Sequence, residues 1–248
     1  MSDRLVSQTA IVTGAASGIG KAIALKLMEH GAKVYAFDLN RNLLLEYFGN
    51  HDSQSIPVAI DVTDQQQVKD EVNAVISKEK KIDILVNCVG ITGITNVKSH
   101  QVDIENLKLV FDVNFMSCVY TSQAVIPNML EHHYGRVLHL ASIAGKEGNA
   151  GMLAYSASKA ALIGMTKVQG AEYAESGITV NAMAPAVIRT PLVDNMPDAQ
   201  VKYMTDKIPM KRCGTLEEAA NLALYIVSPE NSFTTGFTFD LTGGSARY

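Results

Sequence analysis

The chain has 248 residues, 47% of them hydrophobic and 19% charged, a composition that can bury a large core and excludes a disordered chain. Its net charge is −4 and its Lys and Arg residues are scattered, so we expect neither nucleic acid nor a membrane as a partner. No apolar run approaches the roughly 18–20 residues that cross a bilayer, and we expect no secretory signal. Three cysteines (Cys88, Cys118 and Cys213) lack C-x-x-C spacing and indicate neutral thiols rather than a disulfide frame. We therefore expect a cytoplasmic globular protein without a metal.

Short apolar runs alternate with longer helical patterns along the whole chain. Strands are predicted at residues 9–13, 33–38, 57–61, 82–87, 135–140, 178–184 and 236–241, and helices at 18–30, 64–80, 114–132, 154–176 and 216–228. The strand runs lack the polar alternation of half-exposed strands, so both faces of the sheet should be covered and the strands parallel. We predict an α/β fold: a single domain over residues 1–248, with a Rossmann-type doubly wound parallel sheet of about seven strands and helices on both faces.

One stretch interrupts this regular alternation. Residues 185 to about 210 contain four prolines and follow the sixth predicted strand. In open α/β sheets the loops after the strands lie beside the crevice where ligands bind. We therefore predict a substrate loop at about 185–210.

A glycine-rich turn follows the first predicted strand and opens the first helix, with the sequence Thr13-Gly14-Ala15-Ala16-Ser17-Gly18-Ile19-Gly20. Glycines permit a tight turn and a close approach of the backbone to a pyrophosphate, and the helix N-terminus adds amide donors. The candidate cofactor-binding residues are Gly14, Ser17, Gly18, Ile19 and Gly20. A turn of this kind can also be purely structural.

Residues at the ends of the next predicted strands extend this site. Asp38 ends the second strand, where a carboxylate can accept both ribose hydroxyls of an adenosine and would repel a 2′-phosphate, which favours NAD over NADP. Asp38 could also cap the helix that starts near residue 40. Asp61 and Val62 follow the third strand and are placed to contact adenine, although Asp61 could be a local cap. Asn87 and Gly90, at the end of the fourth strand, complete the predicted cofactor site.

A second group of residues suits proton transfer. Tyr155 and Lys159 are four residues apart on one predicted helix, so both side chains face the same way. The ammonium stabilises a phenolate, which can exchange a proton with an alcohol or a ketone. Ser142, just past the fifth strand, can hydrogen-bond a substrate oxygen, and the amide of Asn114 could hold a water that links Lys159 to solvent. Each residue alone also has an ordinary structural explanation, such as a surface Tyr/Lys pair.

Taken together and in this order, these motifs resemble those of the classical short-chain dehydrogenase/reductase family. The resemblance runs from about residue 6 to residue 244 and is specific because the motifs fall at the expected strand ends. It implies a catalytic tetrad of Asn114, Ser142, Tyr155 and Lys159. Tyr155 would be the acid/base, Ser142 would orient the substrate oxygen, and Lys159 would hold the nicotinamide ribose.

The resemblance also implies that Ile188 and Thr190 hold the nicotinamide carboxamide. The chain departs from the family pattern at Cys88-Val89, where Asn-Ala is usual, and at Ala186, where a glycine is usual and the turn must accept a Cβ. Arg189 and Arg247 are candidate substrate-binding residues beside Ser142 and Tyr155, because a guanidinium can bind a carboxylate with two hydrogen bonds. A solvated or interface position explains either arginine equally well.

The resemblance implies an NAD-dependent oxidoreductase that transfers a hydride between a secondary alcohol or ketone and the nicotinamide. Residues 197–210 and 239–248 more loosely resemble bacterial dehydrogenases of 2-keto-3-deoxy sugar acids from the fuconate and rhamnonate pathways. We therefore expect a small polar hydroxy or sugar acid as the substrate. The alternative is a 3-oxoacyl-[acyl-carrier-protein] reductase, which would require NADPH, and a more remote one is a non-catalytic NAD-binding regulator. Family members are usually tetramers, so a homo-oligomer is expected.

Overall fold

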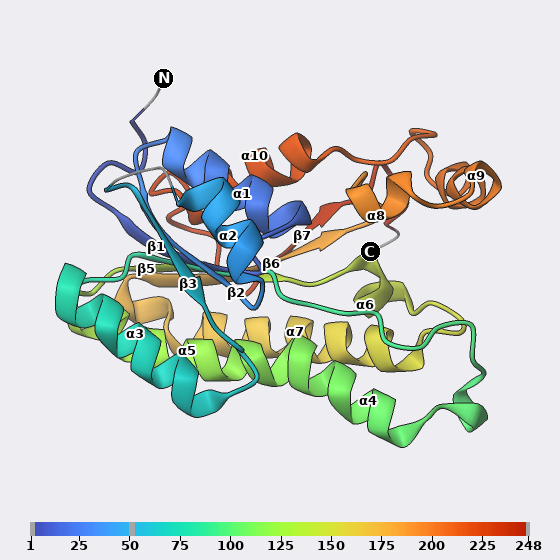
Figure 1. Cartoon of the computed structure of the whole chain (residues 1–248), viewed down its shortest axis with the longest axis horizontal. Helices are drawn as coiled ribbons and strands as arrows, with labels where there is room; N and C mark the ends of the chain where they lie inside the picture. The colour runs from blue at the N-terminus through green and yellow to red at the C-terminus, as the bar shows by residue number, and fades with distance from the viewer. Residues whose placement is uncertain (1–2, 50–52, 247–248) are drawn as a thin grey trace.

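In the part of the chain that the structure describes, residues 3–49 and 53–246 of a computed structural model, seven parallel strands form one sheet in the order β3-β2-β1-β4-β5-β6-β7 (Figure 1). The strands are β1 (Thr9–Thr13), β2 (Lys33–Asp38), β3 (Ser55–Ala59), β4 (Ile84–Asn87), β5 (Gly135–Leu140), β6 (Ile178–Pro185) and β7 (Thr238–Leu241). The order reverses between β1 and β4, which is the switch point where such sheets bind ligands. The predicted doubly wound sheet is therefore confirmed.

Helices cover both faces of the sheet (Figure 1). One face carries α1 (Gly18–Glu29), α2 (Arg41–Phe48) and α10 (Leu216–Val227), and the opposite face carries α3 (Gln65–Glu79), α4 (Ile104–Phe111), α5 (Ser117–Glu131) and α7 (Leu153–Glu172). Each face has its own core, with Leu27 and Leu224 buried on the first and Val72 and Val125 buried on the second. Because both faces are buried, the strands are apolar without alternation, as the sequence indicates.

Several elements have bounds that differ from the prediction. β3 is Ser55–Ala59 and not 57–61. It lies at the edge of the sheet, where a proline such as Pro57, which has no N–H group, is tolerated because one side of the strand has no partner strand. β4 and β7 each begin two residues later than predicted. The expected loop at 185–210 contains two short helices, α8 (Pro191–Asp194) and α9 (Asp198–Asp206).

A continuous helical segment from Ile104 to Glu131 replaces the helix predicted at 114–132. It begins earlier because the Asp103 side chain caps α4 by accepting a hydrogen bond from Asn106 N (2.9 Å). A π-helical turn, Asp112–Met116, joins α4 to α5. By length and composition this segment could cross a membrane, contrary to our expectation. However, 44% of its apolar 18-residue stretch is buried inside the protein. Its apolar side chains therefore contribute to the core beneath β4 and β5.

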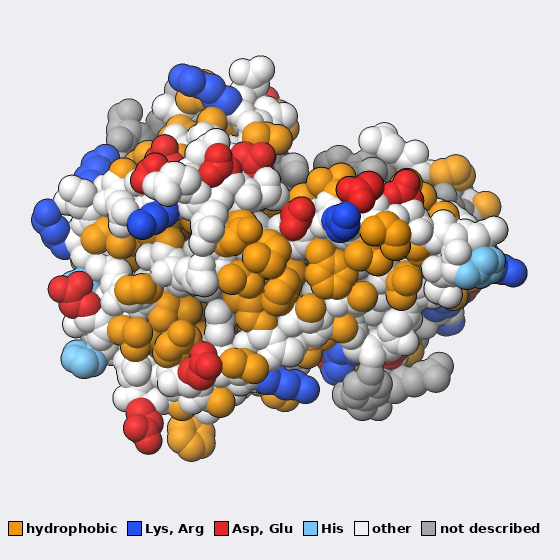
Figure 2. Space-filling view, turned by 90° about the horizontal axis from the view of Figure 1, so that it is seen from below, with side chains coloured by type: hydrophobic (Ala, Val, Ile, Leu, Met, Phe, Trp, Pro, Cys, Tyr) orange, Lys and Arg blue, Asp and Glu red, His pale blue; other side chains and the backbone are white. Residues whose placement is uncertain are grey.

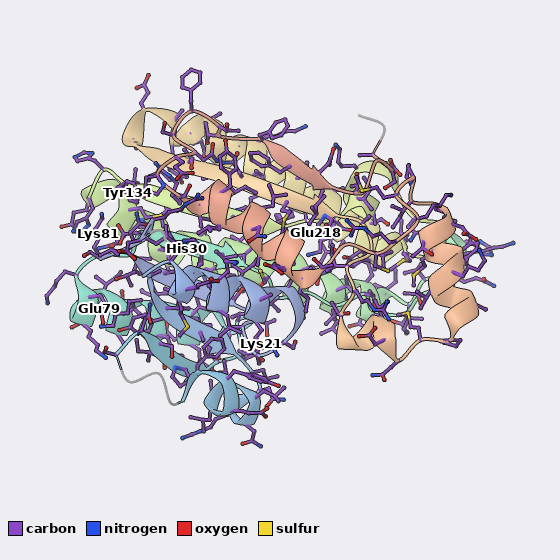
Figure 3. All side chains as sticks on the ribbon, turned by 90° about the horizontal axis from the view of Figure 1, so that it is seen from above. Lys21, His30, Glu79, Lys81, Tyr134 and Glu218 are labelled. Carbon is purple, nitrogen blue, oxygen red and sulfur yellow. The ribbon has the colours of Figure 1, made fainter. Side chains whose placement is uncertain are left out.

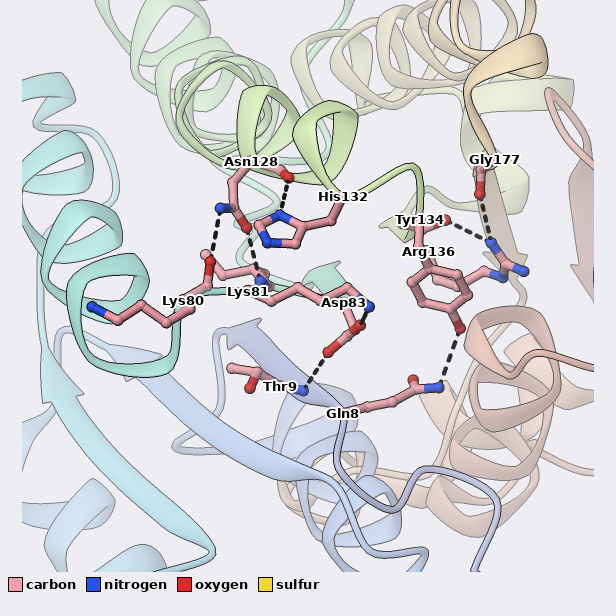
Figure 4. Close-up of polar contacts among 12 residues, drawn as sticks. Gln8, Thr9, Lys80, Lys81, Asp83, Asn128, His132, Tyr134, Arg136 and Gly177 are labelled. Carbon is pink, nitrogen blue, oxygen red and sulfur yellow. Dashed lines mark hydrogen bonds and ion pairs between the residues drawn. The ribbon is translucent and has the colours of Figure 1, made fainter.

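Polar side chains join the amino ends of the central strands, at the edge of the sheet away from the switch-point crevice (Figure 4). Asp83, just before β4, accepts a hydrogen bond from Thr9 N of β1 (2.9 Å). Arg136 of β5 lies over the Tyr134 ring (4.5 Å to its centroid) and donates to Gly177 O, just before β6 (3.1 Å). These contacts fix the starts of four strands and leave the opposite ends for ligands.

A chain of four polar side chains crosses the buried layer between the sheet and helices α5 and α7. Thr121 Oγ1 donates to Asn87 Oδ1 (2.8 Å), Asn87 Nδ2 donates to His139 Nδ1 (3.2 Å), and His139 Nε2 donates to Gln169 Oε1 (3.0 Å). His139 is completely buried, and this burial, together with the Lys159 ammonium, lowers its pKa to about 4. The neutral imidazole therefore links the ends of β4 and β5 to α7.

We expect His139 to make the folded state less stable in mild acid. The folded protein keeps the imidazole neutral down to a pKa of about 4, whereas in the unfolded chain it binds a proton at about pH 6.5. The stabilisation is therefore complete above the unfolded pKa and is lost as the pH falls towards 4, by on the order of 2 kcal/mol between about pH 7.5 and pH 5. Urea unfolding of the wild type and of His139→Asn at both pH values measures this loss. An equal loss in both proteins would contradict the assignment.

Candidate active site

Two adjoining cavities open at the carboxyl ends of β1, β4, β5 and β6. The larger, of about 650 Å³, runs from the glycine-rich turn to Asp38. The smaller, of about 200 Å³, is lined by Ser142, Tyr155 and Lys159 among others. The lining residues that both cavities share are Ile19, Cys88, Gly90, Ile91, Leu140 and Thr190. One extended ligand can therefore reach from Asp38 to Tyr155.

The glycine-rich turn leaves room for a ligand on one side only. A Cβ at Gly14, whose φ is +68°, would lie 3.1 Å from the Cys88 carbonyl carbon, and a Cβ at Gly20 would overlap the Gly14 carbonyl oxygen. By contrast, a Cβ at Gly18 would meet nothing closer than Thr190 Cγ2 at 3.9 Å. Two glycines thus allow close packing of α1 on the strands, and the third faces the cavity at the N-terminus of α1. Backbone N–H groups in this position suit a pyrophosphate.

Asp38 lies at the far end of the larger cavity, and its carboxylate is held in place by the backbone. Oδ2 accepts a hydrogen bond from Ala16 N (3.0 Å) and Oδ1 accepts one from Asn40 N (2.9 Å). The N-cap of α2 is Asn40, whose side chain accepts from Leu43 N (3.2 Å), so the alternative of Asp38 as the cap is wrong. A fixed carboxylate with remaining acceptor positions suits the ribose hydroxyls of an adenosine.

The other predicted cofactor residues divide into two groups. Asp61, Val62 and Gly90 line the larger cavity. Asp61 Oδ1 also accepts hydrogen bonds from the backbone N–H (2.9 Å) and the hydroxyl (2.7 Å) of Thr63, so it shapes its own turn. Asn87 is not among the described residues that line either cavity, because its side chain takes part in the buried chain with His139.

Ser142, Tyr155 and Lys159 meet in the smaller cavity. Lys159 Nζ donates to Leu140 O (2.6 Å) at the end of β5 and lies 5.9 Å from the centroid of the Tyr155 ring. Ser142 Oγ accepts a hydrogen bond from Ala144 N (3.2 Å), so its hydroxyl hydrogen is the group that it can offer to a substrate oxygen. A buried ammonium, a phenol and a hydroxyl donor therefore face one small space.

A close contact between two helices brings these residues together. Ser142 is the N-cap of the short helix α6 (Ile143–Glu147), whereas Lys159 lies in the second turn of α7. A Cβ at Gly145 would lie 2.7 Å from the Lys159 carbonyl carbon and 2.9 Å from Ala160 N. Only a glycine lets α6 approach α7 at this distance, and this approach places Ser142 beside Lys159.

Asn114 lies behind these residues, in the π-helical turn, and is completely buried. Its Nδ2 donates to Ile91 O (2.9 Å) and to Ser158 Oγ (3.0 Å), and its Oδ1 accepts from Ile91 N (2.8 Å). Both amide hydrogens therefore have protein partners, which leaves only Oδ1 for the water that the sequence suggested. The π turn is a local irregularity of the kind often found at functional sites.

The segment after β6 covers the junction of the two cavities. Ile188 and Thr190 both line the smaller cavity. Arg189 N donates to Gly214 O (2.8 Å), which fixes the segment against the residues before α10. Ala186 is not among the residues with positive φ in the described chain, so its backbone accepts a Cβ without strain.

Two charged residues form a pair just after the 185–210 region. Glu218 in the first turn of α10 (Figure 3) forms two hydrogen bonds with Arg212, at 2.9 and 2.7 Å. The guanidinium, with help from the Thr215 backbone, lowers the pKa of Glu218 to about 2. This paired anchor lies at the start of α10, outside the smaller cavity.

The structure does not bring Arg189 into the site. Arg189 is absent from the described lining of the smaller cavity, because its Nε pairs with Asp194 Oδ1 (2.7 Å) and 68% of its side chain is exposed. Arg247 lies outside the described residues. The role of these arginines in substrate binding therefore stays a prediction.

Among the residues that line the smaller cavity, five did not follow from the sequence reasoning, namely Cys88, Ile91, Thr92, Leu140 and Ala141. The signal that could have found them is their position, since each lies at or just after the carboxyl end of β4 or β5. Burial raises the pKa of the Cys88 thiol to about 12, which makes it a neutral wall of the site rather than a nucleophile.

Comparison with known proteins agrees with this geometry. A family model described as "Enoyl-(Acyl carrier protein) reductase" matches residues 14–246. The chain is 42% identical to the 2-dehydro-3-deoxy-L-rhamnonate dehydrogenase (NAD(+)) of Sphingomonas sp. strain SKA58, over 99% of this chain and 98% of that protein. It is 36% identical to the 3-oxoacyl-[acyl-carrier-protein] reductase FabG of Thermotoga maritima, over 97% and 98%. The crystal structure of an NAD+-bound xylitol dehydrogenase, 27% identical, superposes with a TM-score of 0.92 over 97% and 100%.

The chain therefore belongs to the short-chain dehydrogenase/reductase family. It is an oxidoreductase that acts on CH–OH groups. The prediction of NAD as cofactor agrees with the Sphingomonas relative and with the xylitol dehydrogenase structure. The residues present fit a nicotinamide dinucleotide, because the open side of Gly18, the carboxylate of Asp38 and the ammonium of Lys159 line one continuous pair of cavities.

We expect Gly145→Ala to lower turnover more strongly than it lowers NAD binding. The added methyl must push α6 away from α7, since it would lie 2.7 Å from the Lys159 carbonyl carbon. Ser142 then moves relative to Tyr155, and a displacement of about 1 Å can cost on the order of 100-fold in rate. Steady-state kinetics and NAD titration by fluorescence measure the two effects. Unchanged turnover in a folded variant would show that this helix contact does not set the catalytic geometry.

Proposed function

We propose that this enzyme uses NAD to oxidise the secondary hydroxyl of a small 2-keto-3-deoxy sugar acid. The observation that carries this proposal is the 42% identity, over nearly the full length of both chains, to a dehydrogenase that acts on such a sugar acid. The smaller cavity supports it, because Ser142, Tyr155 and Thr92 bring polar groups to it that suit a small polar substrate.

The cofactor would lie along both cavities. Asp38 would accept hydrogen bonds from the adenosine ribose, Asp61 and Val62 would lie at the adenine, and the N-terminus of α1 would hold the pyrophosphate. Lys159 would bind the nicotinamide ribose, and Ile188 and Thr190 would hold the carboxamide. When bound, NAD supplies the hydride acceptor for the reaction. The carboxylate of Asp38 would repel a 2′-phosphate, which favours NAD over NADP.

Tyr155 would move the proton in this mechanism. Its phenolic oxygen would accept the proton of the substrate hydroxyl as the carbon is oxidised to a ketone, with Lys159 Nζ 5.9 Å from the centroid of its ring. Ser142 would donate a hydrogen bond to the same substrate oxygen and orient it. Asn114 would support the arrangement from behind, through Ile91 and the π turn. In the reverse direction the phenol would return the proton to the oxygen.

The alternative function is a 3-oxoacyl-[acyl-carrier-protein] reductase. It is supported by relatives such as the Thermotoga FabG, at a lower identity of 36%. The carboxylate at Asp38 disfavours the NADPH that such a reductase would require. A non-catalytic NAD-binding regulator has no need of Tyr155 and Lys159 in one cavity, so it is the weakest of the three.

We further propose that the enzyme is a homotetramer. Hydrophobic side chains gather on the face formed by α4, α5 and α7 (Figure 2), where Ile104, Leu109 and Val168 are each more than half exposed. A second exposed group, Tyr225 of α10 and Phe237 before β7, lies at the edge of the sheet. Two different apolar faces suit a closed tetramer with two kinds of interface. Light scattering should give a mass near four chains, and a monomer at assay concentration would contradict the proposal.

We also place the enzyme in the cytoplasm. Cys88, Cys118 and Cys213 are all free, and burial raises the pKa of Cys118 to about 11. Free thiols without disulfides suit a reducing compartment. Localisation of a tagged full-length chain by fractionation tests this assignment, and recovery outside the cytoplasm would overturn it.

A substrate panel tests the proposed reaction. We expect formation of NADH, followed by its absorbance, when the purified enzyme is given NAD and 2-keto-3-deoxy sugar acids. Polyols and 3-hydroxyacyl thioesters should react far more slowly, and NADP should replace NAD poorly because of Asp38. Turnover of acyl thioesters alone, with NADP(H), would replace this substrate class with that of the alternative.

The matched control is Tyr155→Phe, which removes only the hydroxyl. We expect it to bind NAD as the wild type does and to lose turnover by on the order of 100-fold to 10,000-fold, the usual contribution of a general acid–base group. Turnover that survives this substitution would exclude Tyr155 as the group that moves the proton, whatever the substrate.

A further inference from the structure

Ser158 lies between the two residues of the Tyr155/Lys159 pair and is completely buried. Its hydroxyl donates to Tyr155 O one turn earlier in α7 (2.8 Å), so its oxygen is left as an acceptor. Asn114 Nδ2 donates to that oxygen (3.0 Å). Ser158 therefore contacts the helical turn that carries Tyr155 on one side and the π turn on the other.

Ser158 completes the hydrogen bonding of the Asn114 amide. One Nδ2 hydrogen goes to Ile91 O and the other to Ser158, while Oδ1 accepts from Ile91 N. If the amide were turned over, Oδ1 would face two oxygens and Nδ2 would face an N–H group, so a single orientation is stable. Without the Ser158 oxygen, one amide hydrogen in a fully buried place would have no partner.

In this orientation the Asn114 oxygen borders a small space beside Gly90 that Lys159 Nζ also borders. A Cβ at Gly90 would lie 3.3 Å from Asn114 Oδ1 and 3.2 Å from Lys159 Nζ, so both atoms border the same small space. The oxygen carries the negative end of the amide dipole, and the ammonium borders the same space. An ammonium in a buried site is sensitive to the direction of such a dipole.

We propose that Ser158 is a positioning residue that holds the Asn114 amide, and through it the Ile91 loop and the environment of Lys159, in the arrangement that proton transfer requires. This inference rests on the roles proposed above for Tyr155 and Lys159. Ser158 touches neither cavity among the described lining residues, so it acts through Asn114 and not by contact with a ligand.

The matched pair of variants is Ser158→Ala and Thr166→Val, each of which removes one buried hydroxyl from α7 with little change of shape. Thr166 donates to Leu162 O (2.9 Å) in the same way, but it lies two turns further along the helix and does not contact Asn114. Thr166→Val therefore shows the effect on folding of losing one buried hydroxyl in α7, without any effect through Asn114.

We expect Ser158→Ala to lower kcat by about tenfold, the value of one buried hydrogen bond, and to move the acid limb of the pH–rate profile to higher pH. Thr166→Val should change neither. In an Asn114→Ala background, Ser158→Ala should have no further effect, because the two residues would act as one unit. Equal losses in Ser158→Ala and Thr166→Val, or an unchanged pH profile in Ser158→Ala, would overturn the proposal.

Hydrogen exchange provides a measurement that does not depend on turnover. The Ile91 N–H is bound by Asn114 Oδ1, so its exchange should become faster in Ser158→Ala and stay unchanged in Thr166→Val. If exchange changes in this way while no substrate reacts, the proposed reaction fails and the positioning role of Ser158 stands. If exchange at Ile91 is the same in both variants and in the wild type, the positioning role fails.

Discussion

The site depends on backbone segments that approach each other more closely than a Cβ allows. Gly14 and Gly20 allow the first turn of α1 to lie close to the ends of β1 and β4, and Gly145 allows α6 to lie close to α7. These contacts come from different parts of the chain but act on the same edge of the sheet. They set how far the glycine-rich turn lies from Ser142, Tyr155 and Lys159, a distance that a bound dinucleotide must match.

A second constraint is the polar content of the buried layer under β4 and β5. Asn87, His139 and Asn114 are fully or almost fully buried, and each is satisfied by hydrogen bonds to protein partners. Buried polar groups cost free energy when a partner is lost, so such a layer tolerates few arrangements. The core on the opposite face, around α1 and α10, consists of apolar side chains, whose contacts are not directional as hydrogen bonds are. The buried polar contacts nearest to Lys159 therefore lie on the face of the sheet that carries α7.

Much of the fold and part of the site could be predicted from local patterns. The strand and helix runs give the doubly wound sheet, and short spacings identify the glycine-rich turn and the Tyr155/Lys159 pair. Where a side chain points at the end of a strand depends on distant partners: Asn87 turns into the core because it meets His139, 52 positions away. The spacing of residues within one strand or helix does not predict this contact. Arg189 is a different case, because its partner Asp194 is only five positions away. This pairing depends on the short helix α8, in a stretch predicted from the sequence as a loop.

The segment after β6, which lies over the junction of the two cavities, has a consequence for folding during synthesis. Ala186 N donates to Leu241 O (2.9 Å), and Arg189 N donates to Gly214 O (2.8 Å), so the segment that carries Ile188 and Thr190 is held by the last strand described and by the residues before α10. During synthesis the glycine-rich turn and Asp38 leave the ribosome well before these partners, which lie more than 170 residues further along the chain. A nascent chain can therefore form one wall of the nucleotide site long before it can close it. Tight retention of the dinucleotide would then serve as a marker of a completely folded chain.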